Sequence, residues 1–177
     1  AVGMDALTAN TTGSYNTALG KEALTTATTG ANNTAIGHEA LKRTTSGSHN
    51  SAVGFEALTY NTTGAWNVAV GWETMEQNTT GEENVGLGTR ALSSNDSGDY
   101  NTAVGNHAMS RFARGDNNTA VGYQALYSAL GAVADNNTAV GTKALYSNTT
   151  GENNVSIGYL SLDANTTGAT NTAIGTS

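Results

Sequence analysis

The sequence has no cysteine, no proline and few charged residues. Without cysteine, neither a disulfide framework nor a thiolate metal site is available. The absence of proline suits an uninterrupted ladder of backbone hydrogen bonds. Charged residues make up 12% of the chain, about half of the usual fraction, so solubility has to come from amide and hydroxyl groups.

The few charges are mostly acidic, and no long apolar run is present. Seven basic side chains against 14 acidic ones give a net charge of −7. A chain of this kind has no basic face to neutralise phosphates, which argues against a nucleic-acid partner. No apolar stretch reaches the length of a membrane span, and no signal peptide is visible. Because the sequence starts and stops inside a repeat, we expect it to be a segment of a longer array or a processed form.

What the chain does have is an internal repeat. Threonine, asparagine and glycine supply 72 of the 177 residues, a polar composition that would suit disorder if the apolar residues did not recur at fixed spacing. A motif of the form Asn-Thr-Ala-Val-Gly recurs every 17 residues, with one spacing of 19. Its copies begin near residues 16, 33, 50, 67, 84, 101, 118, 137, 154 and 171. The full consensus is N-T-A-V-G-x-x-A-L-x-x-N-T-T-G-x-x.

This period predicts an all-β fold, a parallel β-solenoid (β-roll) of about eleven 17-residue coils. The array occupies residues 1–177 as one domain, with a 19-residue irregular repeat at 118–136. We expect N-T-A-V-G to form a strand, A-L a second short strand or extended edge, and N-T-T-G a turn in which Asn and Gly tolerate left-handed backbone conformations. Stacked at about 4.8 Å, the coils would make a rod on the order of 50 Å long.

The strand motifs predict self-association. Adjacent strand residues point to opposite faces, and Ala stands beside Val, Ile or Leu both in the strand motif and in the A-L segment. Apolar side chains on both faces indicate burial on both, one inside the coil and one against a partner. A homotrimer is the simplest closed assembly, and a thin monomeric solenoid is the alternative.

A stacked asparagine at the start of each strand predicts an amide ladder along the rod. Its members are Asn16, Asn33, Asn50, Asn67, Asn84, Asn101, Asn118, Asn137, Asn154 and Asn171. We assign this column a structural role rather than a ligand role.

The repeat resembles the head repeats of trimeric autotransporter adhesins of the YadA-like kind, and more closely the arrays of bacteriophage tail-fibre proteins. The strand motif, such as residues 101–105, and the linking stretch Tyr123-Gln124-Ala125-Leu126-Tyr127-Ser128 carry the resemblance. It implies a left-handed parallel β-roll, three chains to a rod, and attachment at an extracellular, cell-surface or virion location.

The sequence predicts no enzyme. The three histidines, at 38, 49 and 107, lie in different registers, and no nucleophile, metal-ligand or phosphate-binding spacing occurs. We therefore expect no cofactor. Five acids do share one register: Asp5, Glu22, Glu39, Glu56 and Glu73. They would either splay into solvent or hold a cation, but the column later changes sign at Arg90 and Lys143, which disfavours a calcium ladder.

Two surfaces are candidates for binding. Phe55, Tyr60, Trp66 and Trp72 could form an aromatic platform for sugars or pack the rod's flank. The irregular turns of two neighbouring coils could protrude as one patch for a cell-surface receptor or glycan, or be a neutral insertion; the patch comprises Arg111, Phe112, Arg114, Leu130 and Val133.

The function favoured by the sequence is a structural rod or shaft in an extracellular or virion fibre, with lateral receptor attachment. An adhesin head that binds a glycan or protein is the alternative. Aligned Thr side chains raise ice binding as a further alternative, although Val68, Val85 and Val155 interrupt that column.

Overall fold

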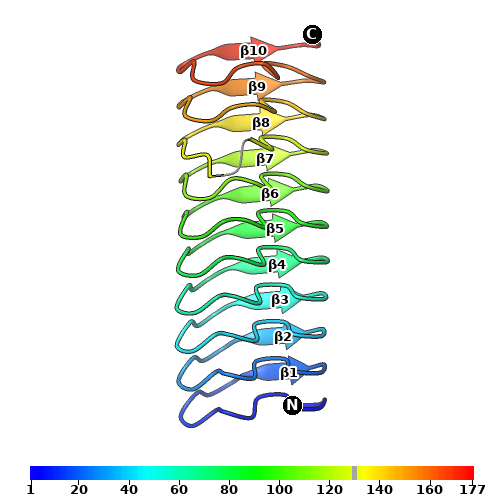
Figure 1. The fold of residues 1–177 in the computed structure, drawn as a ribbon, viewed down its shortest axis with the longest axis vertical. Helices are drawn as coiled ribbons and strands as arrows, with labels where there is room; N and C mark the ends of the chain where they lie inside the picture. The colour runs from blue at the N-terminus through cyan, green and yellow to red at the C-terminus, as the bar shows by residue number, and fades with distance from the viewer. Residues whose placement is uncertain (129–130) are drawn as a thin grey trace.

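The structure, a computed structural model, describes residues 1–128 and 131–177. Ten short parallel strands stack in sequence order into one sheet, and the chain winds once around the rod between successive strands (Figure 1). The strands are β1 (Thr17–Leu19), β2 (Thr34–Ile36), β3 (Ser51–Val53), β4 (Val68–Val70), β5 (Val85–Leu87), β6 (Thr102–Val104), β7 (Thr119–Val121), β8 (Thr138–Val140), β9 (Val155–Ile157) and β10 (Thr172–Ile174). The predicted all-β parallel solenoid is confirmed.

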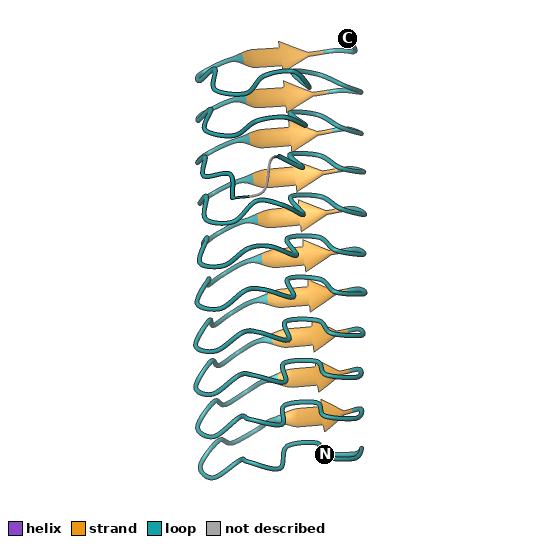
Figure 2. Cartoon of the chain, viewed as in Figure 1, coloured by secondary structure: helices purple, strands orange, loops and turns teal. Residues whose placement is uncertain are grey.

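The register of the sheet follows the sequence period. Val53 pairs with Val70, Val70 with Leu87, and Leu87 with Val104, so these side chains form the continuous column that the repeat predicts. The 19-residue repeat keeps the same register, because Thr119 pairs with Thr138. The extra two residues are therefore absorbed in the loops, which carry the rest of each coil (Figure 2).

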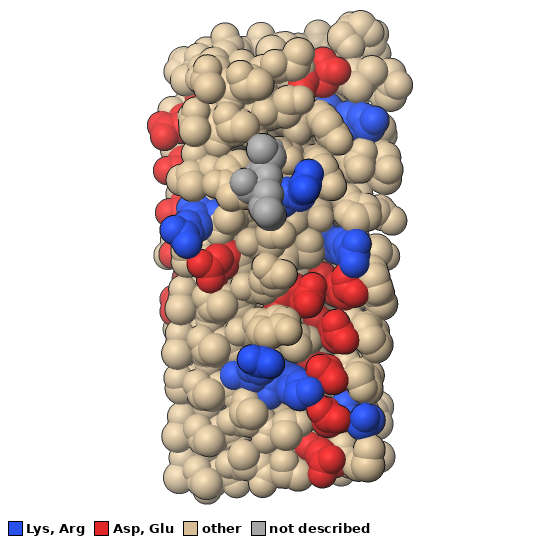
Figure 3. All heavy atoms as spheres, in the orientation of Figure 1, with Lys and Arg blue, Asp and Glu red and all other residues tan. Residues whose placement is uncertain are grey.

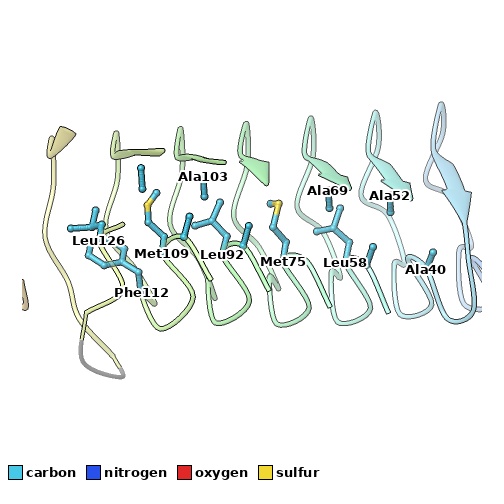
Figure 4. Packing of buried hydrophobic residues seen from close by; sticks show 14 of the residues in the cluster. Ala40, Ala52, Leu58, Ala69, Met75, Leu92, Ala103, Met109, Phe112 and Leu126 are labelled. Atoms are coloured by element: carbon cyan, nitrogen blue, oxygen red, sulfur yellow. The ribbon is translucent and has the colours of Figure 1, made fainter. Parts of the chain in front are cut away.

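The core is narrow and lies between the strands and the A-L segments. The middle residue of every strand except β10 is buried, and residues such as Ala52 and Ala69 point toward a column of Leu and Met side chains (Figure 4). Leu58, Met75 and Leu92 belong to that column, and all are completely buried. Small Ala opposite large Leu lets the two walls of the coil approach closely, as the close packing of protein interiors requires.

The A-L segment is not a second strand, and that prediction was wrong. Ala57 and Leu58 are both fully buried, whereas adjacent residues of a strand would face opposite sides. The physical reason is the backbone: Leu58 has a φ of 54° and Glu56 also has a φ of 54°. These left-handed residues turn the chain so that Ala and Leu both point inward. Only the strand motif therefore offers an outward apolar column.

The N-T-T-G turn also differs from the expected geometry. The left-handed residues lie elsewhere in the coil, and the glycine of this turn, such as Gly64, has no positive φ. Glycine is needed there because a Cβ would lie 2.5 Å from the carbonyl oxygen of Gly81 in the next coil. The asparagine of the turn, such as Asn61, is buried rather than exposed.

The asparagines at the start of the strands form a buried column that ties the coils together. The backbone N–H of Asn101 donates to Oδ1 of Asn84 at 2.9 Å. Nδ2 of Asn84 donates to the carbonyl of Gly98 at 2.8 Å. The same two bonds recur along the rod, as when Asn67 N–H donates to Asn50 Oδ1 at 3.0 Å. Each side chain thus satisfies backbone groups that the narrow core hides from water.

The buried turn asparagines form a second column with gaps. Nδ2 of Asn95 donates to Oδ1 of Asn78 at 2.8 Å, and Nδ2 of Asn78 to Oδ1 of Asn61 at 2.9 Å. The column stops at Phe112, which is fully buried in the next coil and has no amide to donate. Oδ1 of Asn95 accordingly lacks a hydrogen-bond partner among the described residues.

The second column of asparagines is interrupted near the N-terminus, and filling this gap tests how much the column stabilises the fold. Ala27 stands between Asn10 and Thr44 at this register, and Oδ1 of Asn10 and Oγ1 of Thr44 are both buried without a partner within the described part of the chain. In Ala27→Asn, the new Nδ2 would donate to Asn10 and the new Oδ1 would accept from Thr44. We expect the variant to be about 1 kcal/mol more stable, measured as a higher thermal midpoint.

The control for this change is Ala9→Asn, because Ala9 is exposed in the neighbouring coil. It should shift the midpoint little. A midpoint for Ala27→Asn that falls below that of the unchanged protein would contradict the ladder as a source of stability.

Candidate functional site

The aromatic side chains lie in three separate columns, so they do not form one platform. Phe55 stacks between His38, at a centroid distance of 5.2 Å, and Trp72, at 6.3 Å. The guanidinium of Arg90 caps Trp72 at 4.7 Å from the ring centroid. These rings stand directly after the strand glycines and run along one edge of the sheet.

Trp66 and Tyr60 belong to the other two columns. Trp66 stacks on His49 at 5.4 Å and lies just before the strand, at the opposite edge of the sheet from Phe55. Tyr60 lies in the loops, where the guanidinium of Arg43 sits 4.6 Å from its ring centroid. In each column the stacking runs along the rod, because residues 17 apart are neighbours.

The proposed irregular patch is divided between core and surface. Phe112 is fully buried and belongs to the core cluster, so its expected role as an exposed contact was wrong. It is buried because it takes the register of the inward-pointing turn asparagines, and its backbone also pairs with Ala132. Arg111, Arg114 and Val133 are exposed. Leu130 lies outside the described residues.

Basic side chains pair with part of the acidic column: Lys42 comes from a neighbouring register, and Arg90 stands in the register of the column itself. Nζ of Lys42 lies 2.6 Å from Glu22 and 3.1 Å from Glu39, and Nε of Arg90 lies 2.6 Å from Glu73. Hydrogen bonds from Lys42 and Lys21 lower the pKa of Glu22. Figure 3 shows these acidic side chains gathered in a stripe on the loop side of the rod. Within residues 1–128 and 131–177, no group of three or more His, Cys, Asp and Glu side chains could hold a metal ion.

The outer face of the sheet is flat and uncharged. The first and third residues of each strand point outward, and none of these twenty positions in the ten strands is ionisable. Val53, Val70 and Leu87 remain 37–40% exposed, although they stand in the middle of the sheet. Phe55 and Trp72 border this face on one edge and Trp66 on the other. A face of this composition suits a protein contact, where aromatic residues are enriched and charges are depleted.

A groove lies on the loop side, away from the sheet. It encloses about 450 Å³ and is lined by Tyr60, Glu76, Gln77, Thr79, Ser94, Asp96, Ala113, Arg114 and Gly131. A second hollow of about 250 Å³ shares the side chains of Glu76, Gln77 and Ser94. Burial, followed by the neighbouring charges of Glu73 and Glu56, raises the pKa of Glu76.

Sequence reasoning missed this groove, although the repeat contains the signal for it. Tyr60, Gln77 and Ser94 share one register in three successive coils, and all three line the groove. A large aromatic side chain is therefore followed by two smaller ones. Aligning the coils by register, rather than inspecting aromatic residues by their closeness in sequence, would have located the hollow.

No protein-family model, curated protein or solved structure matches this chain. No helix in the described part of the chain is long and apolar enough to cross a membrane.

Proposed function

We propose that this protein is a structural rod that self-associates through the outer face of its sheet, as a shaft segment of an extracellular or virion fibre. The uncharged outer face is the observation that carries the proposal. A monomer in water would leave two columns of apolar or hydroxyl side chains exposed along its whole length, whereas all the charged residues stand outside the strands. The extracellular or virion setting rests on the resemblance of the repeat to fibre arrays.

The size of the face supports a stable contact. Ten strands at about 4.8 Å, and a width of five residues including the aromatic edges, give a footprint of roughly 700 Å². Specific interfaces bury about 800 Å² on each partner. Three copies around an axis, each turning this face inward, would cover all of it, and we propose a homotrimer.

The expected result for Val70→Lys combined with Val104→Lys is a monomeric rod. Two ammonium groups in the middle of the face would have to be desolvated on association, which costs several kcal/mol without a partner charge. Sedimentation velocity of the unchanged protein should give a trimer and that of the double variant a monomer. Circular dichroism should be the same for both, because the side chains project out of the coil.

The control is Thr63→Lys with Thr150→Lys, which adds the same charge at exposed positions of the N-T-T-G turns, outside the proposed contact face. These substitutions should leave the mass unchanged. An unchanged protein that is monomeric and fully folded at micromolar concentration would refute the assembly.

Ice binding is a second candidate, because Thr and Val columns project from this same flat face at regular spacing. A monomer that shows thermal hysteresis, lost in Val70→Lys with Val104→Lys, would favour this function over the rod assembly.

A further inference from the structure

We infer that the groove beside Tyr60 binds an uncharged saccharide, which would give the rod a lateral attachment site. The groove uses no residue of the outer sheet face, so this inference goes beyond self-association and can fail separately from it. Its volume of about 450 Å³ falls in the range of roughly 300–1,000 Å³ that is typical of small-ligand sites.

The shape of the groove follows from the register. One column of the loop side presents Arg43, Tyr60, Gln77, Ser94 and Arg111 in five successive coils. Arg43 covers Tyr60 from the preceding coil at 4.6 Å, which holds the ring in place. The ring then lines one end of a hollow that opens over the shorter side chains of Gln77 and Ser94.

The opposite end is built by the two irregular coils. Ala113 and Arg114 replace the Thr-Thr of the regular turn, and Gly131 comes from the 19-residue repeat. In the regular coils the turns are uniform, so the hollow forms where the repeat is broken. The irregular turns of the repeat thus form one wall of the groove. Their exposed Arg114 lines the same groove as Tyr60.

Three of the polar side chains that line the groove contact one another. Oγ1 of Thr79 donates to Oδ1 of Asp96 at 2.6 Å, and Nη2 of Arg114 lies 3.5 Å from Oδ2 of Asp96. Carboxylate, amide and hydroxyl groups together provide both acceptors and donors. Several such groups around one aromatic face match a sugar ring, which presents hydroxyls at its rim and an apolar C–H face.

The charges select among ligands. Glu76 and Asp96 disfavour an anionic sugar. Arg114 pairs with Asp96, and Glu76 is half-buried at a place where loss of hydration raises its pKa and disfavours its charge, so these acids have little attraction for a cationic peptide. An uncharged, hydroxyl-rich ligand is the class that remains.

The test is saturation-transfer NMR on the full chain with maltotriose, cellotriose, mannotriose and chitotriose as neutral probes, and with sialyllactose and trilysine as charged ones. We expect at least one neutral trisaccharide to bind. Tyr60→Ala should weaken its Kd by about ten-fold through the loss of ring contact, and Tyr60→Phe should keep most of the affinity. Tyr159→Ala removes an exposed ring outside the groove and should have no effect.

A second variant keeps the test decisive if Tyr60→Ala folds poorly. Gln77 is exposed in the coil after Tyr60, so Gln77→Trp should stack on Tyr60, fill the hollow and abolish binding while the thermal midpoint stays or rises. The inference is overturned if no neutral probe binds, if only sialyllactose or trilysine binds, or if binding survives Gln77→Trp. A loss of binding in Tyr159→Ala equal to that in Tyr60→Ala would overturn it as well.

Discussion

Replacing Asn84 with Ala should destabilise the rod by about 3 kcal/mol. The variant leaves the N–H of Asn101 without its acceptor, and the carbonyl of Gly98 keeps only the hydrogen bond from Nδ2 of Asn95. Asn84 is completely buried. Each buried group left unsatisfied costs about 1–3 kcal/mol. A thermal or urea unfolding curve would measure the loss.

Asn84→Asp separates the acceptor role from the donor role. The carboxylate still accepts from Asn101 N–H, but it cannot donate to Gly98, and burial disfavours its charge. Its pKa in the folded protein should therefore rise above the unfolded value. When the folded pKa of an acid is raised, the protonated form is favoured by folding, so the stability of this variant should increase as the pH falls through that pKa.

The control is Asn106→Ala, since Asn106 is exposed and lies in the loops next to this region. It should change stability by less than about 0.5 kcal/mol. Equal losses in Asn84→Ala and Asn106→Ala would mean that the ladder contributes nothing beyond an ordinary surface amide.

The sequence was sufficient for the fold because every coil repeats the same local information. A period of 17 residues determines which residues are neighbours, and the pairing of Val53 with Val70 follows from it directly. Whether a given side chain points into the coil or out to solvent was harder to predict from the sequence than the pairing of the strands. Leu58 points inward because its backbone has a left-handed conformation. The order of apolar and β-branched residues in the sequence does not indicate which residues have a positive φ.

The candidate sites were less predictable than the fold for the same reason. Phe112 was expected at the surface because it stands in an irregular turn that replaces the polar turn of the repeat. Its register places it instead where asparagines point into the coil, and burial of a phenyl ring is strongly favourable there. The groove beside Tyr60 depends on side-chain lengths in successive coils, which a reading along the chain does not compare.

Replacing Gly54 with Ala is the change expected to disrupt the stacking of coils most directly. Gly54 has a φ of 144°, and a Cβ there would overlap the carbonyl oxygen of Gly71 and lie 2.7 Å from its carbonyl carbon. Backbone strain alone costs about 1–3 kcal/mol. The overlap adds to it, because the atoms met are backbone atoms of the next coil and can move only if the coils separate. We expect a loss of at least about 3 kcal/mol, and hydrogen exchange should show that amides near Gly54 and Gly71 lose protection first.

Gly131→Ala isolates the strain from the overlap. Gly131 also has a positive φ, of 83°, but no atom of residues 1–128 or 133–177 lies within 4 Å of a Cβ built there. Its replacement should therefore cost only the conformational term, about 1 kcal/mol. The difference between the two variants measures how tightly one coil is pressed on the next at the strand glycine. If Gly54→Ala and Gly131→Ala were equally stable, the coils would be free to separate at that glycine, and close stacking could not be what requires glycine at this register.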